Sequence, residues 1–133
     1  MTNKSKKIIS EISAGELLDK ISILEIKLDK IKNQNRQQEI SKEYKILQKT
    51  KEMNIESTQE INQLIEEIKI INLKLWEIED KIRVCEKNKD FGKEFIELAR
   101  AVYLTNDKRA KIKSKINEIV GSNIKEIKEY ADY

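Results

Sequence analysis

Hydrophobic residues recur every three or four positions through most of this chain, and charged or polar residues fill the intervals between them. Because an α-helix has 3.6 residues per turn, this spacing places the apolar side chains of each segment on one helix face. Short polar breaks join the segments, so consecutive helices are expected to lie side by side in opposite directions. The pattern predicts an all-α fold with one domain over residues 1–133. The expected arrangement is an antiparallel up-and-down helical bundle, or a coiled-coil-like one, with three to four long helices plus a short C-terminal helix.

The first helix is predicted to begin after Ser13. Ser13 and Glu16 form an S-x-x-E capping box, in which each side chain accepts a hydrogen bond from the other residue's backbone N–H. The apolar row that follows is Leu17, Ile21, Leu24, Leu28 and Ile31. Residues 1–12 are expected to be an extended N-terminal segment. Capping, the helix dipole and surface pairing account for Glu16, Asp19 and Lys20 without a further role.

A polar break over residues 32–39 interrupts this row. The row resumes out of register, at Ile40, Tyr44 and Leu47. A turn near residues 33–35 is therefore predicted, and one kinked helix is the alternative. Ser57 and Glu60 form a second capping box, which predicts the start of a helix of about 30 residues. Its apolar row is Ile61, Leu64, Ile68, Ile71, Leu75, Ile78, Ile82 and Cys85.

The last long helix is predicted to be capped by Asp90 and ended by Gly121, because glycine readily adopts the left-handed conformation found there. Ser122 is then expected to cap a short tail helix over residues 122–133. The apolar row begins at Phe91 and, continued at a seven-residue repeat, runs through Phe95, Leu98, Val102, Thr105, Arg109, Ile112, Ile116 and Ile119. Lys108, Lys111 and Lys115 lie beside the row and are expected to be solvated.

Thr105 and Arg109 are the polar members of this row. An arginine there must find an acidic partner or reach water, because an unpaired buried charge is costly. If Arg109 is structural, Glu79 of the preceding helix is the expected partner. If Arg109 is functional, it should line a polar pocket with Thr105 and Asn106, ready for an anion.

A second face of the long helix carries Trp76, Asp80 and Arg83 in the stretch "LWEIEDKIR". A tryptophan off the main row needs something to cover it, and another helix or a second subunit is the favoured cover over a ligand. Together with the polar break in the last helix, these positions give the candidate ligand or partner residues. They are Trp76, Glu79, Asp80, Arg83, Arg100, Thr105, Asn106, Asp107 and Arg109.

The composition excludes several kinds of chemistry. The chain has no histidine and one cysteine, so it lacks His-based triads, the usual zinc sites and intramolecular disulfides. Cys85 is expected to be buried and unreactive, and neither cofactor nor metal is expected. A net charge of +3, from 27 basic and 24 acidic residues, does not favour nucleic-acid binding. With no signal peptide and no spanning segment, a cytoplasmic protein without membrane association is predicted.

The stretches "ISAGELLDKISILEIK", "LWEIEDKIR", "FIELARAVYLTNDKRAKIKSKIN" and "GSNIKEIKEY" resemble an uncharacterised family of small helical bacterial and phage proteins, a domain of unknown function. The resemblance covers nearly the whole chain outside residues 32–60. It implies no catalytic residue. Members are sometimes encoded near glycosyltransferases, which implies an association with glycan synthesis.

The sequence is therefore consistent with three functions. The favoured one is a non-enzymatic helical module for protein–protein interaction or assembly, with a protein partner or a second copy in a homodimer closing the apolar rows. The first alternative is a binding protein for an anionic sugar or nucleotide, or a small helical enzyme. Its cleft would be lined by Glu79, Arg100, Asn106, Asp107 and Arg109. The second alternative is nucleic-acid binding through the lysines.

Overall fold

A computed structural model describes residues 5–133 of the chain, and residues 1–4 are outside the description. The described part has four helices, which are α1 (Ala14–Lys30), α2 (Gln34–Asn54), α3 (Gln59–Lys87) and α4 (Lys93–Val120). No strand occurs in it, and the helices account for more than two-thirds of the residues, so the all-α prediction is confirmed. None of these helices combines the length and apolar composition that crossing a bilayer requires.

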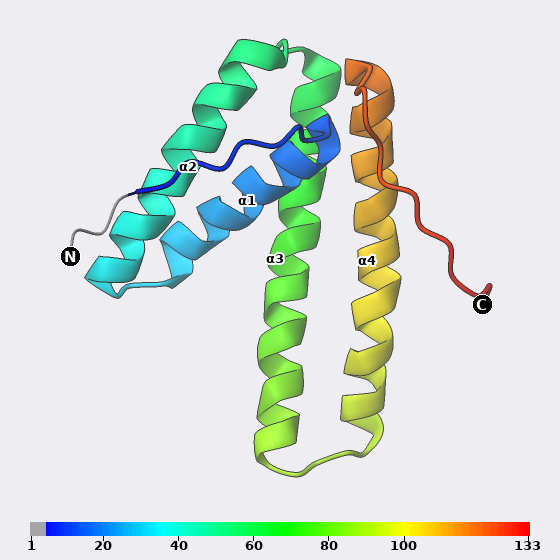
Figure 1. Cartoon of the computed structure of the whole chain (residues 1–133). Coiled ribbons are helices and arrows are strands. Elements are labelled where there is room, and N and C mark those ends of the chain that lie inside the picture. The colour runs from blue at the N-terminus through cyan, green and yellow to red at the C-terminus, as the bar shows by residue number, and fades with distance from the viewer. Residues whose placement is uncertain (1–4) are drawn as a thin grey trace.

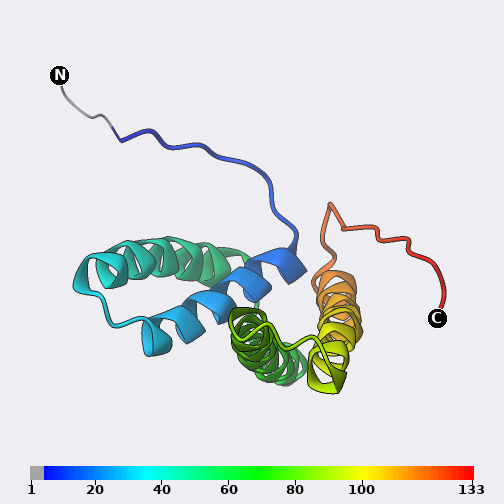
Figure 2. The same cartoon turned by 90° about the horizontal axis from the view of Figure 1, so that it is seen from below.

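The helices form two hairpins (Figure 1). In one, α3 and α4 run antiparallel along their whole lengths; in the other, α1 and α2 are joined by a short turn. Helix α1 lies across the upper half of the α3–α4 hairpin and separates it from α2 (Figures 1 and 2). In the described chain, α1 contacts all three other helices, whereas α2 contacts only α1 among the helices. Helix α1 is therefore the central element of the fold.

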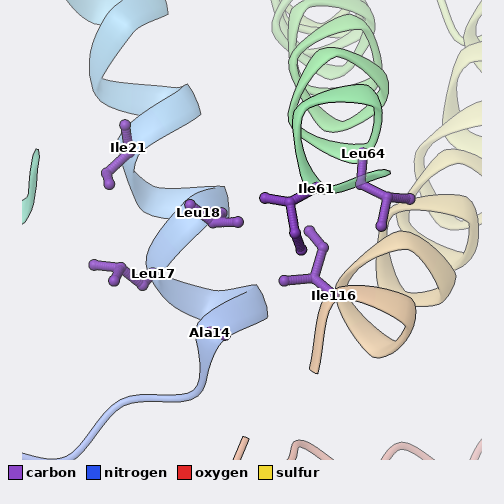
Figure 3. Packing of buried hydrophobic residues seen from close by; sticks show 7 residues of the cluster. All are labelled: Ala14, Leu17, Leu18, Ile21, Ile61, Leu64 and Ile116. Carbon is purple, nitrogen blue, oxygen red and sulfur yellow. The ribbon is translucent and has the colours of Figure 1, made fainter. Parts of the chain in front are cut away.

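The hydrophobic core gathers around the N-terminal half of α1. Its members are Ala14, Leu17, Leu18, Ile21, Ile61, Leu64 and Ile116 (Figure 3). Leu18 points toward Ile61 and Ile116, whereas Leu17 and Ile21 point away from them. Helix α1 is thus buried on two sides. The predicted row from Leu17 to Ile31 describes only one of them.

The helix starts differ in part from the predictions. Ser13 caps α1 as predicted, with its hydroxyl accepting from the N–H of Glu16. A non-helical break separates α1 from α2, so the alternative of one kinked helix is wrong. The break covers residues 31–33 and begins two residues before the turn predicted near 33–35. The cap of α3 is Thr58 rather than Ser57, because the Thr58 hydroxyl reaches the N–H of Ile61.

The start of α4 also corrects a prediction. Gly92, and not Asp90, is the N-cap residue, and Phe91 lies in the loop before the helix. The Asp90 carboxylate accepts from the backbone N–H of Gly92, which organises the loop instead. At the other end, Gly121 terminates α4 with a φ of 74°, as predicted.

The predicted tail helix over residues 122–133 is wrong: this segment has no helix, and most of it is exposed. The segment instead forms hydrogen bonds with other parts of the chain. The Ser122 hydroxyl accepts from the N–H of Ala14 at 3.0 Å, and Asn123 donates to Glu11 at 2.8 Å. Residues 5–12 also lack regular secondary structure, in line with the predicted extended segment.

Two apolar rows need local corrections. In α3, Asn72 is buried in place of its neighbour Ile71, which is only half-buried. In α4, Asn117 is buried, whereas Ile119 is exposed. Cys85 is buried as predicted. Lys108, Lys111 and Lys115 are exposed, also as predicted.

Candidate functional site

A line of buried polar residues runs between α1, α3 and α4, and it begins where the backbones of α1 and α4 meet. The N–H of Gly15 donates to Asn117 Oδ1 at 2.6 Å. A Cβ atom at position 15 would lie 2.5 Å from the carbonyl oxygen of Lys113, so only glycine fits without displacing a helix. This close approach brings the polar face of α1 against α4.

The next member is Asp19, which is buried although it was expected at the surface. Its Oδ1 accepts from Asn72 Nδ2 at 2.8 Å, and its Oδ2 lies 3.6 Å from Lys113 Nζ. Ser22 Oγ, 3.4 Å from the same amide nitrogen, is a second acceptor for Asn72. Burial of these polar groups is tolerated because each has a partner.

Lys113 supplies the positive charge that compensates Asp19. Its ammonium also contacts Glu16 at 2.7 Å and Glu126 of the tail at 3.4 Å. Burial alone would lower the pKa of Lys113, but the hydrogen bond to Glu16 and the charges of Asp19, Glu16 and Glu126 outweigh it and raise the pKa. Lys113 therefore stays charged, and it joins α4 to α1 and to the tail.

The line ends at Arg109, whose guanidinium is held by two neutral amides. Its Nη1 donates to Asn72 Oδ1 at 3.0 Å, and its Nη2 donates to Asn106 Oδ1 at 2.7 Å. Because Asn72 donates its NH₂ to Asp19, its oxygen must face Arg109. Among residues 5–133, no carboxylate forms an ion pair with Arg109. The guanidinium is thus oriented by neutral partners and forms no ion pair of its own.

Arg109 lines a groove of about 530 Å³ between α1, α3 and α4. The lining residues are Ile23 of α1, Asn72, Leu75, Trp76, Glu79, Asp80 and Arg83 of α3, and Asn106 and Arg109 of α4. Trp76, the single tryptophan of the chain, is half-buried in this wall. Arg83 forms an ion pair with Glu79 one turn before it on the same helix. The groove combines an apolar wall, two carboxylates and an oriented arginine.

The groove brings together most of the residues that the sequence nominated. They are Trp76, Glu79, Asp80, Arg83, Asn106 and Arg109. The expected pairing of Arg109 with Glu79 is wrong, because Glu79 pairs with Arg83 and two asparagines hold Arg109.

Three nominated residues lie elsewhere. Thr105 is buried in the helix interface rather than in the groove. Arg100 is exposed on α4 and does not line the groove. Asp107 accepts from the Tyr133 hydroxyl in a second hollow beneath the tail, which Tyr103 and Tyr130 line together with Asn106 and Arg109 of the groove. Tyr103 and Tyr133 meet there edge to face, with their centroids 5.4 Å apart.

The candidate residues predicted from the sequence do not include those that orient Arg109, namely Asp19, Ser22 and Asn72. A signal existed in the spacing, since Asp19 and Ser22 are three positions apart and Asn72 is four positions after the buried Ile68. Polar residues at such intervals, within helices that also carry apolar rows, mark a second face turned inward. Short polar side chains there indicate a hydrogen-bonded contact between helices.

Farther along the hairpin, the interface between α3 and α4 is less well covered. Between Ile78 and the end of α3 only Ile78 and Cys85 are buried, and α4 buries no residue from Lys93 to Leu104. Ile82, Phe95 and Val102 are half-buried there. Burial raises the pKa of the Cys85 thiol, and the charges of Glu94 and Asp90 raise it further, which favours the unreactive protonated form.

The groove offers Arg109 as a donor for an anionic group. Within residues 5–133, no three His, Cys, Asp or Glu side chains are grouped so that they could hold a metal ion. An arginine presented by neutral partners in a partly apolar groove can bind a carboxylate or phosphate through two parallel hydrogen bonds.

Comparison with known proteins gives a family but no described relative. No curated protein matches the chain, and no solved structure does. One family model, described as a family of unknown function (DUF6165), matches residues 8–132. Since the match covers nearly the whole sequence, including every residue of the groove, the chain belongs to this family of unknown function.

Proposed function

We propose that this protein binds a small ligand through a carboxylate or phosphate group, in the groove between α1, α3 and α4. The observation that carries the proposal is the environment of Arg109, which is oriented by Asn72 and Asn106 and forms no ion pair with a carboxylate of the described chain. A half-buried guanidinium whose neighbours leave some of its N–H groups free can donate them to an incoming anion. The function is binding and presentation, without a chemical step.

The rigidity of the support favours ligand recognition. Asn72 cannot rotate its amide freely because Asp19 and Ser22 accept from its nitrogen. A donor group held in place before the ligand arrives loses little conformational freedom on binding, and this increases affinity. The line of polar contacts from Lys113 to Arg109 therefore acts as a scaffold for the anion site.

The test is titration of the protein with inorganic phosphate, followed by calorimetry and by the fluorescence of Trp76. We expect saturable binding to the unaltered protein and its loss in Arg109→Met. Arg100→Met is the matched control, since Arg100 is an exposed arginine of the same helix that does not line the groove. Absence of binding to the unaltered protein, or equal binding by Arg109→Met, would refute the proposal.

A second candidate function is self-association as a helical assembly module, and the poorly covered end of the α3–α4 hairpin favours it. Phe95, Ala99 and Val102 are half-buried at spacings of four and three, so they share one face of α4. A third helix is needed to cover such a face. A second copy in a closed two-fold dimer is a common way to provide it.

Ala99→Glu and Ala101→Glu separate this candidate from simple surface effects. Both alanines are half-buried, but residue 101 lies off the face that Phe95 and Val102 share. If the protein is a dimer through this face, light scattering should give a dimer mass for the unaltered chain and for Ala101→Glu, and a monomer mass for Ala99→Glu. A monomeric unaltered protein at the highest soluble concentration would exclude this candidate.

A further inference from the structure

The groove around Arg109 is larger than a free anion needs. Its volume of about 530 Å³ is in the range of pockets that hold whole small molecules rather than single ions. Arg109 and its two asparagines account for one end only. The rest of the wall must therefore select for what is attached to the anion.

Four side chains follow one another along α3 from the anion end outward. Asn72, Trp76, Asp80 and Arg83 are spaced by four, four and three residues, so they form one row on the helix surface. Each step is about one helical turn, and the row from Asn72 to Asp80 spans roughly 11 Å. A ligand anchored at Arg109 would place its next part over Trp76 and its far part beside Asp80.

Trp76 provides a flat apolar surface in the middle of this row. Ile23 of α1 and Leu75 of α3 line the groove with it. The indole is half-buried in the wall and leaves part of its surface to the groove. A ring with at least one apolar face would be recognised by stacking here, since aromatic side chains favour such contacts.

Asp80, the next member of the row after Trp76, presents a carboxylate to the groove. Carboxylates at neutral pH are acceptors only. Arg83, the last member of the row, is paired with Glu79, whereas the Asp80 carboxylate has no hydrogen bond or ion pair to any residue within 5–133. Hydroxyl groups can therefore donate to Asp80, and an anionic group directly beside it would be repelled.

We infer that the ligand of the groove is a hydroxylated ring carrying one oxyanion, with the chemistry of a sugar phosphate or sugar acid. The oxyanion accepts from Arg109, the apolar face of the ring stacks on Trp76, and the ring hydroxyls donate to Asp80. This inference rests on the proposed function, because it needs the anion site at Arg109.

The experiment compares four probes by calorimetry: inorganic phosphate, cyclohexyl phosphate, a hexose phosphate and adenosine monophosphate. We expect the hexose phosphate to bind about tenfold more tightly than cyclohexyl phosphate, which lacks ring hydroxyls, and cyclohexyl phosphate to bind more tightly than phosphate. Trp76→Leu should remove the gain from the ring while leaving phosphate binding intact. Asp80→Asn should weaken the hexose phosphate alone, and Asp29→Asn, at an exposed position of α1 outside both hollows, should change nothing.

The outcomes separate this inference from the proposed function. If phosphate binds in an Arg109-dependent way but the hexose phosphate binds no better, the ligand class is wrong and the anion site stands. Equal affinities for the hexose phosphate and cyclohexyl phosphate would overturn the role of the hydroxyls. Tighter binding of adenosine monophosphate than of the hexose phosphate would identify a flat base as the ring and overturn the sugar-like class. If none of the four binds, both proposals fall.

Discussion

The α3–α4 hairpin is one continuous pair of helices, yet its two halves are packed differently. The proximal half, residues 59–77 and 105–120, is crossed by α1 and contains the fully buried Ile68 and Ile116. The distal half, residues 78–87 and 93–104, buries only Ile78 and Cys85. Both halves carry apolar rows of similar spacing. The difference shows that a third helix, and not the pattern alone, turns a helical hairpin into a closed core.

The candidate site lies at the boundary between these halves. The groove lined by Trp76 and Arg109 spans this boundary, since its wall on α3 extends from Asn72 to Arg83. A binding groove at such a boundary is pre-formed, because the proximal core holds its upper part in place. The difference in packing between the two halves therefore affects function as well as stability.

One substitution in each half gives the most direct test of whether the two halves are packed differently. Ile116→Ala should destabilise the protein by about 2–5 kcal/mol, because it leaves a cavity in a fully buried site. Ile82→Ala, the same change at a half-buried distal position, should cost clearly less. Denaturant unfolding monitored by circular dichroism measures both. An equal or greater cost for Ile82→Ala would show that the distal half is covered in solution, as in the proposed dimer.

The close approach of α1 to α4 predicts the next largest effect. Gly15→Ala would place its Cβ 2.5 Å from the Lys113 carbonyl oxygen, so the helices must separate, at a cost of about 1–3 kcal/mol. Gly92→Ala, in the exposed loop, is the control and should change stability far less. Thermal unfolding decides the matter, and identical midpoints for the two variants would contradict this account of the helix contact.

Asp19→Ala tests the buried polar line that connects the proximal core to the groove. Its removal takes the main acceptor from the Asn72 amide, while Ser22 remains within 3.4 Å, so we expect a loss of about 1 kcal/mol. The orientation of Arg109 should loosen as well, which weakens phosphate binding. Unchanged phosphate affinity in this variant would mean that Arg109 does not depend on the line. Asp29→Asn, at an exposed position of α1 outside the line, serves as the control.

The smallest expected effect is a pH dependence of the tail contact. Burial would raise the pKa of Glu126, but Lys113 and Lys128 outweigh it and hold the pKa below its ordinary value of 4.5. The folded carboxyl therefore contributes stability above pH 4.5, and the contribution is lost as the pH falls through the folded pKa. For this half-exposed group it should be less than about 1 kcal/mol. Glu126→Gln should flatten that part of the acid unfolding profile, and an unchanged slope would argue against the contact.

The pattern of apolar and polar residues along a helix reveals only some of the residues that form the site. Arg109 and Trp76 stood out because each breaks an apolar row or lies off one. Asp19 did not stand out, because a carboxylate in the first turns of a helix has an ordinary explanation at the surface. Its burial requires α4 to lie beside α1, which is a relation between residues about a hundred positions apart. The spacing of Asp19 and Ser22 marks one face of α1, but it does not show which distant helix packs against that face.

Capping groups, glycine and the spacing of apolar residues within a few turns predict the four long helices, a break before α2, the left-handed end of α4 at Gly121 and the burial of Cys85. Packing between the helices decides that α1 has a second buried face, that Asn72 rather than Ile71 turns inward, and that residues 122–133 form no helix. Neighbouring faces of a helix differ by only a small angle, so the element that packs against the helix decides which face is buried. Two polar contacts decide this here, from Gly15 to Asn117 and from Asp19 to Asn72. They form only after the helices have met.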